Sequence, residues 1–360
     1  MTLHKQKIRR LIHSLAMSWI IWVLAALLFG LVRVWGVEDL PAIQRLSPFV
    51  PWAFLLEMLI FGTTIGVPFG ILDFFLSQEK IHRLPYWKLI AIKSGAQIVL
   101  SVFSVVVLVI VNNHYRHTDL GILHFIFSPS TYLWLVFSGI ISLFIYFLQV
   151  VRSKFGEKMM INILLGKYHY PRVESRIFMF LDMRSSTTHA ESLGHIRFSS
   201  LLQHCFRDLT SAIILHDVEI YQYVGDEAIL TWKVADGLRN ENCLRTYFHF
   251  IQFLEKKRGY YEKKYGFLPF FKAGVHLGDV TVSEVGVVKR EIAYHSDVLN
   301  TAARIQGKCN EFDAGLLVSE KLKDMLSVLH DISFEQIGGI SLRGKHLPVN
   351  IYKAVLLQSR

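Results

Sequence analysis

Long apolar stretches dominate the first part of the chain. Three of them contain no Lys, Arg, Asp or Glu, at residues 11–32, 94–115 and 120–151. A fourth stretch, residues 50–76, is as apolar but includes Glu57 and Asp73. Each can supply the roughly 20 apolar residues that a membrane-spanning helix needs. The pattern predicts a transmembrane region over residues 1–151, with helices at about 12–32, 51–76, 89–111 and 130–151.

The positions of basic residues indicate how this region is oriented. Lys and Arg cluster before the first span, between the second and third, and after the fourth: Lys5, Lys7, Arg9, Arg10, Lys80, Arg83, Lys88, Arg152, Lys154 and Lys158. Basic loops stay on the cytoplasmic side of a membrane. We expect a multi-pass protein of the cell inner (plasma) membrane, in contact with the lipid bilayer, with its N-terminus and C-terminal part cytoplasmic. For Glu57 and Asp73 we favour a position near a span end or a partner on another helix.

Beyond residue 151 the pattern changes to short apolar strands alternating with amphipathic helices. Residues 152–173 are predicted to carry a linker helix into the cytoplasm, stopped by Gly166 and Pro171. Residues 174–360 are predicted to form a soluble domain. The expected order is strand 176–183, helix 189–216, strands 218–224 and 227–233, helix 239–265, strand 270–276, a hairpin near 278–290, strand 290–295, helix 297–311, and strands 315–319, 332–338 and 350–355. This β-α-β-β-α-β order predicts an α+β fold of the ferredoxin-like or palm type.

Composition supports this division. Only 19% of the 360 residues are charged and 52% are hydrophobic, against about one quarter charged in an ordinary soluble domain. The formal net charge of +10 is shared equally between residues 1–150 and the remainder, so it marks no nucleic-acid-binding lobe, and we expect no nucleic-acid partner. The three cysteines all lie after residue 200. Such a sparse, odd set indicates reduced thiols in a cytoplasmic domain.

Two acidic residues stand where chemistry is expected. Asp182 follows the apolar strand Ile177–Leu181, and Asp226 lies at the tip of the next hairpin. If the two strands are neighbours in one sheet, both carboxylates converge at one end. Paired carboxylates bind Mg²⁺ and leave coordination positions for water and phosphate. An aspartate at a strand end or turn is also common without such a role, so each residue alone carries little weight.

The segment after Asp182 offers a place for phosphate. Ser185, Ser186 and Thr187 lead into the start of a predicted helix. Backbone N–H groups at a helix N-terminus bind phosphate oxygens. We therefore expect these residues to lie against the phosphates of a nucleotide.

A third motif lies on the predicted helix at 297–311. Asn300 and Arg304 are four residues apart, so their side chains share one face of the helix. An Asn can orient a ribose, and an Arg can neutralise the charge that builds on phosphate in a transition state. Alone, the pair would equally suit an exposed helix start.

Four segments in this order resemble the successive signatures of class III adenylate and guanylate cyclase catalytic domains: FMFLDMRSST, YQYVGDEAILTW, KAGVHLGDVTVSEVG and YHSDVLNTAARIQ. The resemblance covers about residues 174–355. It implies that the domain pairs head to tail as a homodimer and cyclises a nucleoside triphosphate with release of pyrophosphate. It implies two Mg²⁺ or Mn²⁺ ions per site, held by Asp182, Asp226 and the Met183 carbonyl. It also implies that Asn300 and Arg304 are transition-state residues supplied by the partner.

A closing segment, SLRGKHLPVNIY (341–352), also resembles this family. The resemblance implies that Arg343, with Lys345 beside it, contacts the triphosphate. Two positions depart from the common pattern, because the residues that select the purine base are Gln222 and Ala293 here. We favour ATP over GTP by analogy with bacterial members. Two alternatives are a catalytically inactive, nucleotide-binding receptor and, with less support, a diguanylate cyclase, whose GGDEF turn is similar to VGDEA.

Overall fold

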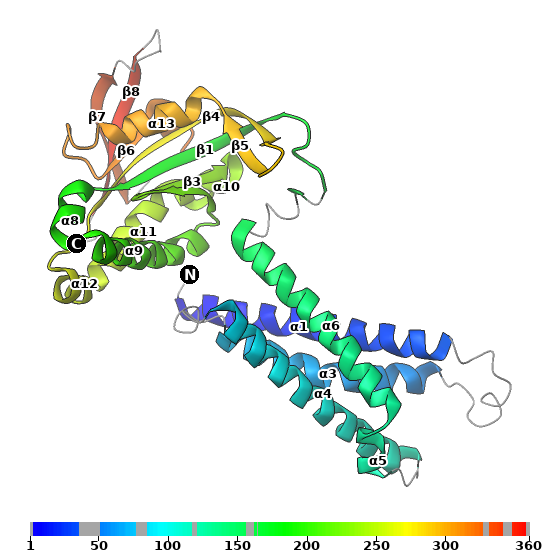
Figure 1. Cartoon of the computed structure of the whole chain (residues 1–360). Coiled ribbons are helices and arrows are strands. Elements are labelled where there is room, and N and C mark those ends of the chain that lie inside the picture. Colours follow the sequence, from blue (N-terminus) through cyan, green and yellow to red (C-terminus); the bar gives the residue numbers. More distant parts are fainter. Residues whose placement is uncertain are drawn as a thin grey trace. The chain divides into compact units, whose positions relative to one another are not determined.

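The chain forms two compact units, Met1–Lys154 and Phe155–Arg360, each of which is coloured along the sequence in Figure 1. The computed structural model describes residues 3–35, 51–76, 85–116, 121–155, 162–163, 165–326, 331–340 and 348–357. Arg343 and Lys345, for which a triphosphate contact is predicted, lie outside these residues.

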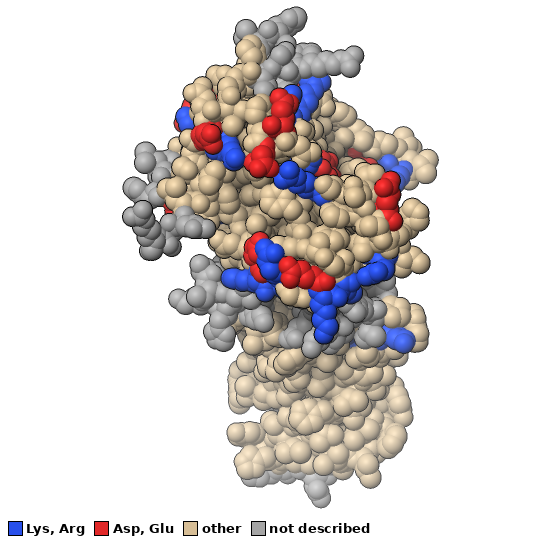
Figure 2. Space-filling view, turned by 90° about the vertical axis from the view of Figure 1, so that its left-hand side faces the viewer, with Lys and Arg blue, Asp and Glu red and all other residues tan. Residues whose placement is uncertain are grey.

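The first unit is a bundle of helices. Its described helices are α1 (Leu3–Trp35), α3 (Pro51–Leu76), α4 (Tyr86–Arg116), α5 (Ile122–Ile126) and α6 (Pro129–Phe155). Four of them are long and apolar enough to cross a membrane over Leu11–Val32, Phe54–Leu76, Trp87–Tyr115 and Pro129–Val151. In the view of Figure 2, the described part of this unit's surface shows few charged side chains, whereas charged side chains gather over the other unit. The first unit therefore has the surface of a membrane-associated region.

Glycines allow α1 and α3 to pack closely. Gly62, Gly66 and Gly70 recur every four residues along one side of α3. A Cβ atom added at Gly62 would lie 2.5 Å from Val23 Cα, and one at Gly66 would lie 2.9 Å from Trp19 Cα. Small residues at this spacing let the backbones of membrane helices approach and gain van der Waals contact. This feature was not anticipated in the sequence analysis.

In the part of the chain that the structure describes, the second unit is built on an eight-stranded sheet. Its strands are β1 (Arg172–Met183), β2 (Glu219–Val224), β3 (Glu227–Lys233), β4 (Phe271–Val285), β5 (Glu291–His295), β6 (Leu316–Ser319), β7 (Ile332–Ile340) and β8 (Val349–Leu356). The spatial order is β2-β3-β1-β4-β6-β8-β7, with β5 paired to β4. The β4–β6 pair is parallel and the other pairs are antiparallel. This mixed sheet with its helices confirms the predicted α+β fold.

The two faces of the sheet carry different helices. The helices are α8 (Ser186–Leu193), α9 (His195–Leu215), α10 (Val234–Leu238), α11 (Asn242–Lys256), α12 (Arg258–Tyr265), α13 (Asp297–Gly307) and α14 (Glu320–Lys323). Alternate residues of β1 point to opposite faces. Met179 and Leu181 join the core formed with α9 and α11, whereas Phe178 and Phe180 pack with residues of α13. Figure 1 shows α13 on the opposite side of the sheet from α9 and α11.

Three predicted elements differ from the structure. The predicted helix at 189–216 is two helices, α8 and α9, broken at Gly194, whose φ is +72°. The predicted helix at 239–265 is a short 3-10 helix, Arg239–Glu241, followed by α11 and α12, which are separated at Lys257. The predicted hairpin near 278–290 is present as the antiparallel β4–β5 pair, but the predicted strand at 270–276 continues as β4 to Val285, and the turn begins at Gly286, whose φ is +90°. Gly278 serves packing instead, since a Cβ atom there would lie 2.5 Å from the Val298 side chain of α13.

The predicted linker helix at 152–173 falls partly outside the described residues. Helix α6 ends at Phe155, residues 165–170 form turns, and β1 begins at Arg172. Gly166 has a φ of +63°, which is a left-handed conformation that ends helices. Tyr168 is buried in this turn, and its backbone carbonyl accepts a hydrogen bond from the Glu284 N–H of β4.

Candidate active site

Acidic side chains meet at one end of the central strands. Asp182 lies at the end of β1 on the face of the sheet that α13 covers, between its cross-strand partners Glu227 on β3 and Lys272 on β4. Asp226 stands in the two-residue turn between β2 and β3, where Gly225 has a φ of +60°. Strand pairing thus brings together two carboxylates that are 44 residues apart in the chain.

The charges of these groups act on one another. Burial is the main reason why the pKa of Asp182 rises to about 6; the Asp226 carboxyl raises it further, whereas Lys272 and Gln306 partly oppose the rise. Burial, followed by the charges of Asp182 and Asp226, raises the pKa of Glu227 to about 7. Raised pKa values in a half-buried group of carboxyls mean that their ionised forms are poorly solvated and repel one another. A divalent cation at this end of the strands would stabilise the ionised carboxylates.

The donor set fits a hard cation that keeps open coordination positions. Within the described residues, no group of three His, Cys, Asp or Glu side chains is arranged to hold a metal ion. Two aspartates with a backbone carbonyl, such as that of Met183, would fill only part of the coordination shell of Mg²⁺. Mg²⁺ usually retains several waters and takes phosphate oxygens as further ligands.

The segment that follows Asp182 opens a helix. Ser185 has a φ of +57° and precedes α8, which begins at Ser186. Ser185 and Thr187 are exposed and Ser186 is half-buried. The first N–H groups of α8 therefore lie three to five residues from Asp182 and remain available to an anion.

Helix α13 presents two different faces. Val298, Ala302 and Ile305 are buried against the sheet. Asn300 is exposed and Arg304, one turn further, is half-buried on the side away from this buried row. The chain therefore directs Asn300 outward rather than towards its own Asp182.

The remaining predicted positions lie on β2 and β5. Gln222 is exposed on β2 at an irregularity in its pairing with β3. Ala293 is half-buried on β5 and pairs with Ser283 of β4. Both belong to edges of the sheet, where a planar base can approach.

Two residues at the site were missed by the sequence analysis. Lys272 is buried, and its Nζ lies 3.5 Å from Oδ2 of Asp182. Gln306 is buried on α13, and its Nε2 donates to the same oxygen at 3.0 Å. Only strand register and helix docking reveal these partners, because they lie 90 and 124 residues from Asp182 in the chain.

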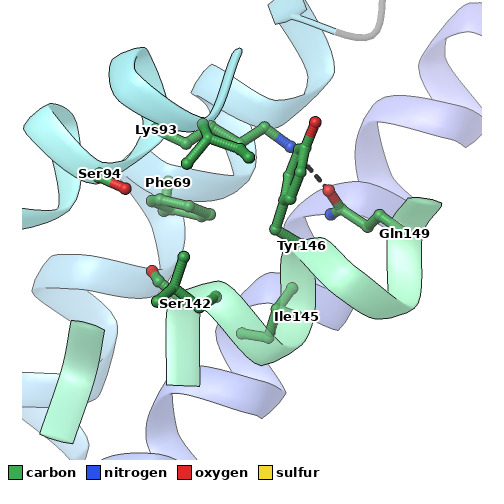
Figure 3. Close-up of a pocket in the computed structure, with 9 residues that line it drawn as sticks. Phe69, Lys93, Ser94, Ser142, Ile145, Tyr146 and Gln149 are labelled. Carbon is green, nitrogen blue, oxygen red and sulfur yellow. Dashed lines mark hydrogen bonds between the residues drawn. The ribbon is translucent and has the colours of Figure 1, made fainter. Parts of the chain in front are cut away.

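A second polar cluster lies inside the helical unit. Lys93 of α4 donates to Asp73 of α3 at 2.6 Å and to Gln149 of α6 at 2.7 Å, while the Gln149 amide donates to Asp73 at 3.2 Å. Figure 3 shows Lys93 and Gln149 beside Tyr146, and the Lys93 ammonium lies 5.3 Å from the centre of that ring. The adjoining pocket is lined mainly by Phe69, Ile90, Ser94, Ser142, Leu143 and Ile145. Asp73 therefore has partners on two other helices.

The known proteins that this chain resembles are adenylate and guanylate cyclases. Residues 169–355 match the family model described as adenylate and guanylate cyclase catalytic domain. The chain is 30% identical over 201 residues to adenylate cyclase 2 of Rhizobium meliloti (strain 1021), covering 56% of this chain and 55% of that protein. It is 27% identical over 183 residues to an adenylate cyclase of Anabaena cylindrica, covering 49% of this chain and 36% of that protein.

A solved structure shares the fold. A bacterial light-regulated adenylyl cyclase superposes with a TM-score of 0.54 at 18% sequence identity, covering 64% of this chain and 67% of that chain. At this identity the likeness concerns the fold alone. The chain spans about half or less of the length of the curated relatives that it matches.

Proposed function

This chain belongs to the class III adenylate and guanylate cyclase family, and from that premise we propose that it converts ATP, in preference to GTP, into the 3′,5′-cyclic nucleotide and pyrophosphate. The observation that carries the proposal is that Asp182 and Asp226 converge at one end of the central strands. The start of α8 follows Asp182 closely in the chain. In the reaction, the ribose 3′-oxygen forms a bond to the α-phosphorus. The bond from that phosphorus to pyrophosphate breaks, and the 3′-hydroxyl proton leaves to solvent.

Asp182, Asp226 and the Met183 carbonyl would hold two Mg²⁺ or Mn²⁺ ions. When bound, such ions lower the pKa of the 3′-hydroxyl and stabilise the negative charge of the leaving pyrophosphate. The protein residues orient the nucleotide. The α8 N-terminus at Ser185, Ser186 and Thr187 donates N–H groups to phosphate oxygens.

We further propose that the active site is shared between two copies of the chain. Asn300 and Arg304 face away from the sheet that carries Asp182, so a second copy can receive them. There Asn300 would orient the ribose, and Arg304 would neutralise charge on the phosphates as it develops. Arg343 and Lys345 would contact the triphosphate, and Gln222 and Ala293 would lie beside the purine. A homodimer is then required for turnover.

The helical unit would anchor this enzyme in the inner (plasma) membrane as a multi-pass protein. We assign residues 1–151 to the membrane region, 152–173 to the linker and 174–360 to the catalytic domain. The apolar surface of α1, α3, α4 and α6 supports the membrane assignment, and the distribution of Lys and Arg supports cytoplasmic placement of the N-terminus and the catalytic domain.

The full chain in detergent, supplied with Mn²⁺ and either ATP or GTP, tests the activity by product analysis. We expect cyclic AMP from ATP. Cyclic GMP as the main product would reverse the base preference, cyclic di-GMP would indicate a diguanylate cyclase, and nucleotide binding without product would indicate an inactive receptor. Asp182→Ala and Asp226→Ala should each abolish turnover while leaving the protein folded, and activity retained in both would refute the metal assignment.

Mixing two inactive variants tests the shared site. A heterodimer of Asp226→Ala with Arg304→Ala contains one site in which neither substitution falls, so part of the activity should return. Two chains with different affinity tags allow the heterodimer to be isolated. Absence of activity in the isolated heterodimer would argue against head-to-tail pairing.

A further inference from the structure

One oxygen of Asp182 is held by two side chains from different elements. The Nε2 atom of Gln306 on α13 donates a hydrogen bond of 3.0 Å to Oδ2. The Nζ atom of Lys272 on β4 lies 3.5 Å from the same oxygen. The side chains of Lys272 and Asp182 are 11% and 23% exposed, and Gln306 as a whole is 7% exposed. These contacts are therefore formed largely out of solvent, where they restrict the carboxylate most.

The fold places Gln306 there through a close helix–strand contact. Helix α13 lies directly on Gly274 of β4, where an added Cβ atom would be 2.2 Å from the Gln306 backbone N and 2.6 Å from the Ala302 carbonyl oxygen. Asp182 is the cross-strand neighbour of Lys272, two residues before Gly274. The glycine lets the helix come down onto the sheet, so that the Gln306 amide reaches across β4 to the end of β1.

We propose that Gln306 is a positioning residue for the metal-binding carboxylate of Asp182. Its amide holds Oδ2, which leaves Oδ1 for a divalent cation. Lys272 supplies a nearby positive charge, whereas Gln306 supplies direction through a hydrogen bond of fixed geometry. This inference rests on the proposed function, because it concerns the metal site of the cyclase reaction.

The Gln306–Asp182 hydrogen bond also connects the proposed metal-binding residue with the helix that carries the residues proposed for the partner's site. Gln306 lies on the same helix as Asn300 and Arg304, two residues beyond the latter. In the proposed dimer, Arg304 would serve one site, whereas Asp182 of the same chain would serve the other. The hydrogen bond thus links the metal carboxylate of each chain to the helix that this chain lends to its partner.

Binding of Mn²⁺ to the full chain in detergent, without nucleotide and followed by electron paramagnetic resonance, tests the proposal. Hydrogen-bond partners of metal ligands typically contribute 10–100-fold to metal affinity. We expect Gln306→Leu to raise the Kd for Mn²⁺ by about 10–100-fold. Gln203→Leu, the same substitution at an exposed position on α9, is the matched control and should leave the Kd unchanged. A Kd for Gln306→Leu equal to that of Gln203→Leu overturns the proposal.

A second readout separates positioning from general damage. If Gln306 only positions Asp182, the Mn²⁺ concentration that half-saturates cyclisation rises by the same factor, and turnover recovers at saturating Mn²⁺. Turnover that stays low at every Mn²⁺ concentration would show a structural defect and overturn the proposal. Should Gln306→Leu fail to fold, Gln306→Asn takes its place, because it keeps the amide on a side chain one methylene shorter and too short to reach Asp182.

Asp182→Asn distinguishes this inference from the proposed function. If Asp182→Asn leaves Mn²⁺ binding intact, the metal assignment itself fails. If Asp182→Asn weakens Mn²⁺ binding but neither Gln306 variant does, the metal site stands and only the positioning role of Gln306 is refuted.

Discussion

Replacing Gly274 by Ala should disturb the active site without touching any residue that contacts substrate. The added methyl group would lie 2.2 Å from the Gln306 backbone N, more than 1 Å short of the 3.4 Å at which ordinary contact begins. The opposing atoms belong to the backbone of α13, so no side-chain rotation relieves the overlap. The helix must move away from the sheet and carry Asn300, Arg304 and Gln306 with it.

The size of the effect follows from this overlap. Overpacking a close-packed core costs about 1–3 kcal/mol, and for a unit of this size each kcal/mol lowers Tm by about 2–4 °C. A displacement of about 1 Å in a catalytic group can reduce turnover about 100-fold. We therefore expect Gly274→Ala to lower the Tm of the catalytic unit by about 2–12 °C and turnover by about 10–100-fold.

Thermal unfolding and cyclic nucleotide formation, both measured on the full chain in detergent, provide the assay. Gly307→Ala is the control, because Gly307 lies on the same helix with no atom within 4 Å of an added Cβ. We expect Gly307→Ala to match the unmodified chain in both measurements. A Gly274→Ala protein with the Tm and turnover of the Gly307→Ala control would refute the close contact between α13 and β4.

Three further predictions concern stability. Gly66→Leu should lower the Tm of the helical unit, because its Cβ would lie 2.9 Å from the α1 backbone; an unchanged Tm in detergent would contradict the glycine contact. Lys93→Met leaves the Asp73 carboxylate without its cation inside an apolar bundle, at a cost of about 3–5 kcal/mol, whereas Lys93→Met with Asp73→Leu should recover most of the Tm. No recovery in the double variant would argue against the ion pair. Burial lowers the pKa of His216 to about 4, with the Asn242 hydrogen bond opposing it in part. The unfolded chain takes up this proton below about pH 6.5, so the free energy of unfolding should fall as pH drops from about 6.5 to 4. Urea unfolding at several pH values gives the free energy of unfolding, which should fall less steeply with decreasing pH for His216→Gln than for the unmodified chain.

Local pattern was sufficient to predict much of the second unit. The β2–β3 hairpin was predicted as strands 218–224 and 227–233 around a tight turn at Gly225 and Asp226, and the observed strands Glu219–Val224 and Glu227–Lys233 follow it closely. The order of four motifs indicated the class III cyclase family, which the family match confirms. These features depend on residues near one another in the chain, where spacing alone carries the information.

Glycines show where local pattern was insufficient. Gly278 resembles a turn residue but lies within β4, because α13 needs the space above it, whereas Gly286 makes the turn. A glycine can serve either a positive φ or a close approach, and only the packed structure distinguishes the two. The same holds for Gly62 and Gly66, whose role depends on the neighbouring helix α1.

By itself, the sequence determined the class of each half of the chain and the candidate acids, since apolar length, strand alternation and turn residues are local properties. The tertiary structure decided the surroundings of those acids. Lys272 meets Asp182 because two strands pair in one register, and Gln306 meets it because α13 packs on Gly274. Contacts between residues 90 or more positions apart depend on sheet order and helix docking, which arise from burial of the whole core and leave no mark in any short segment.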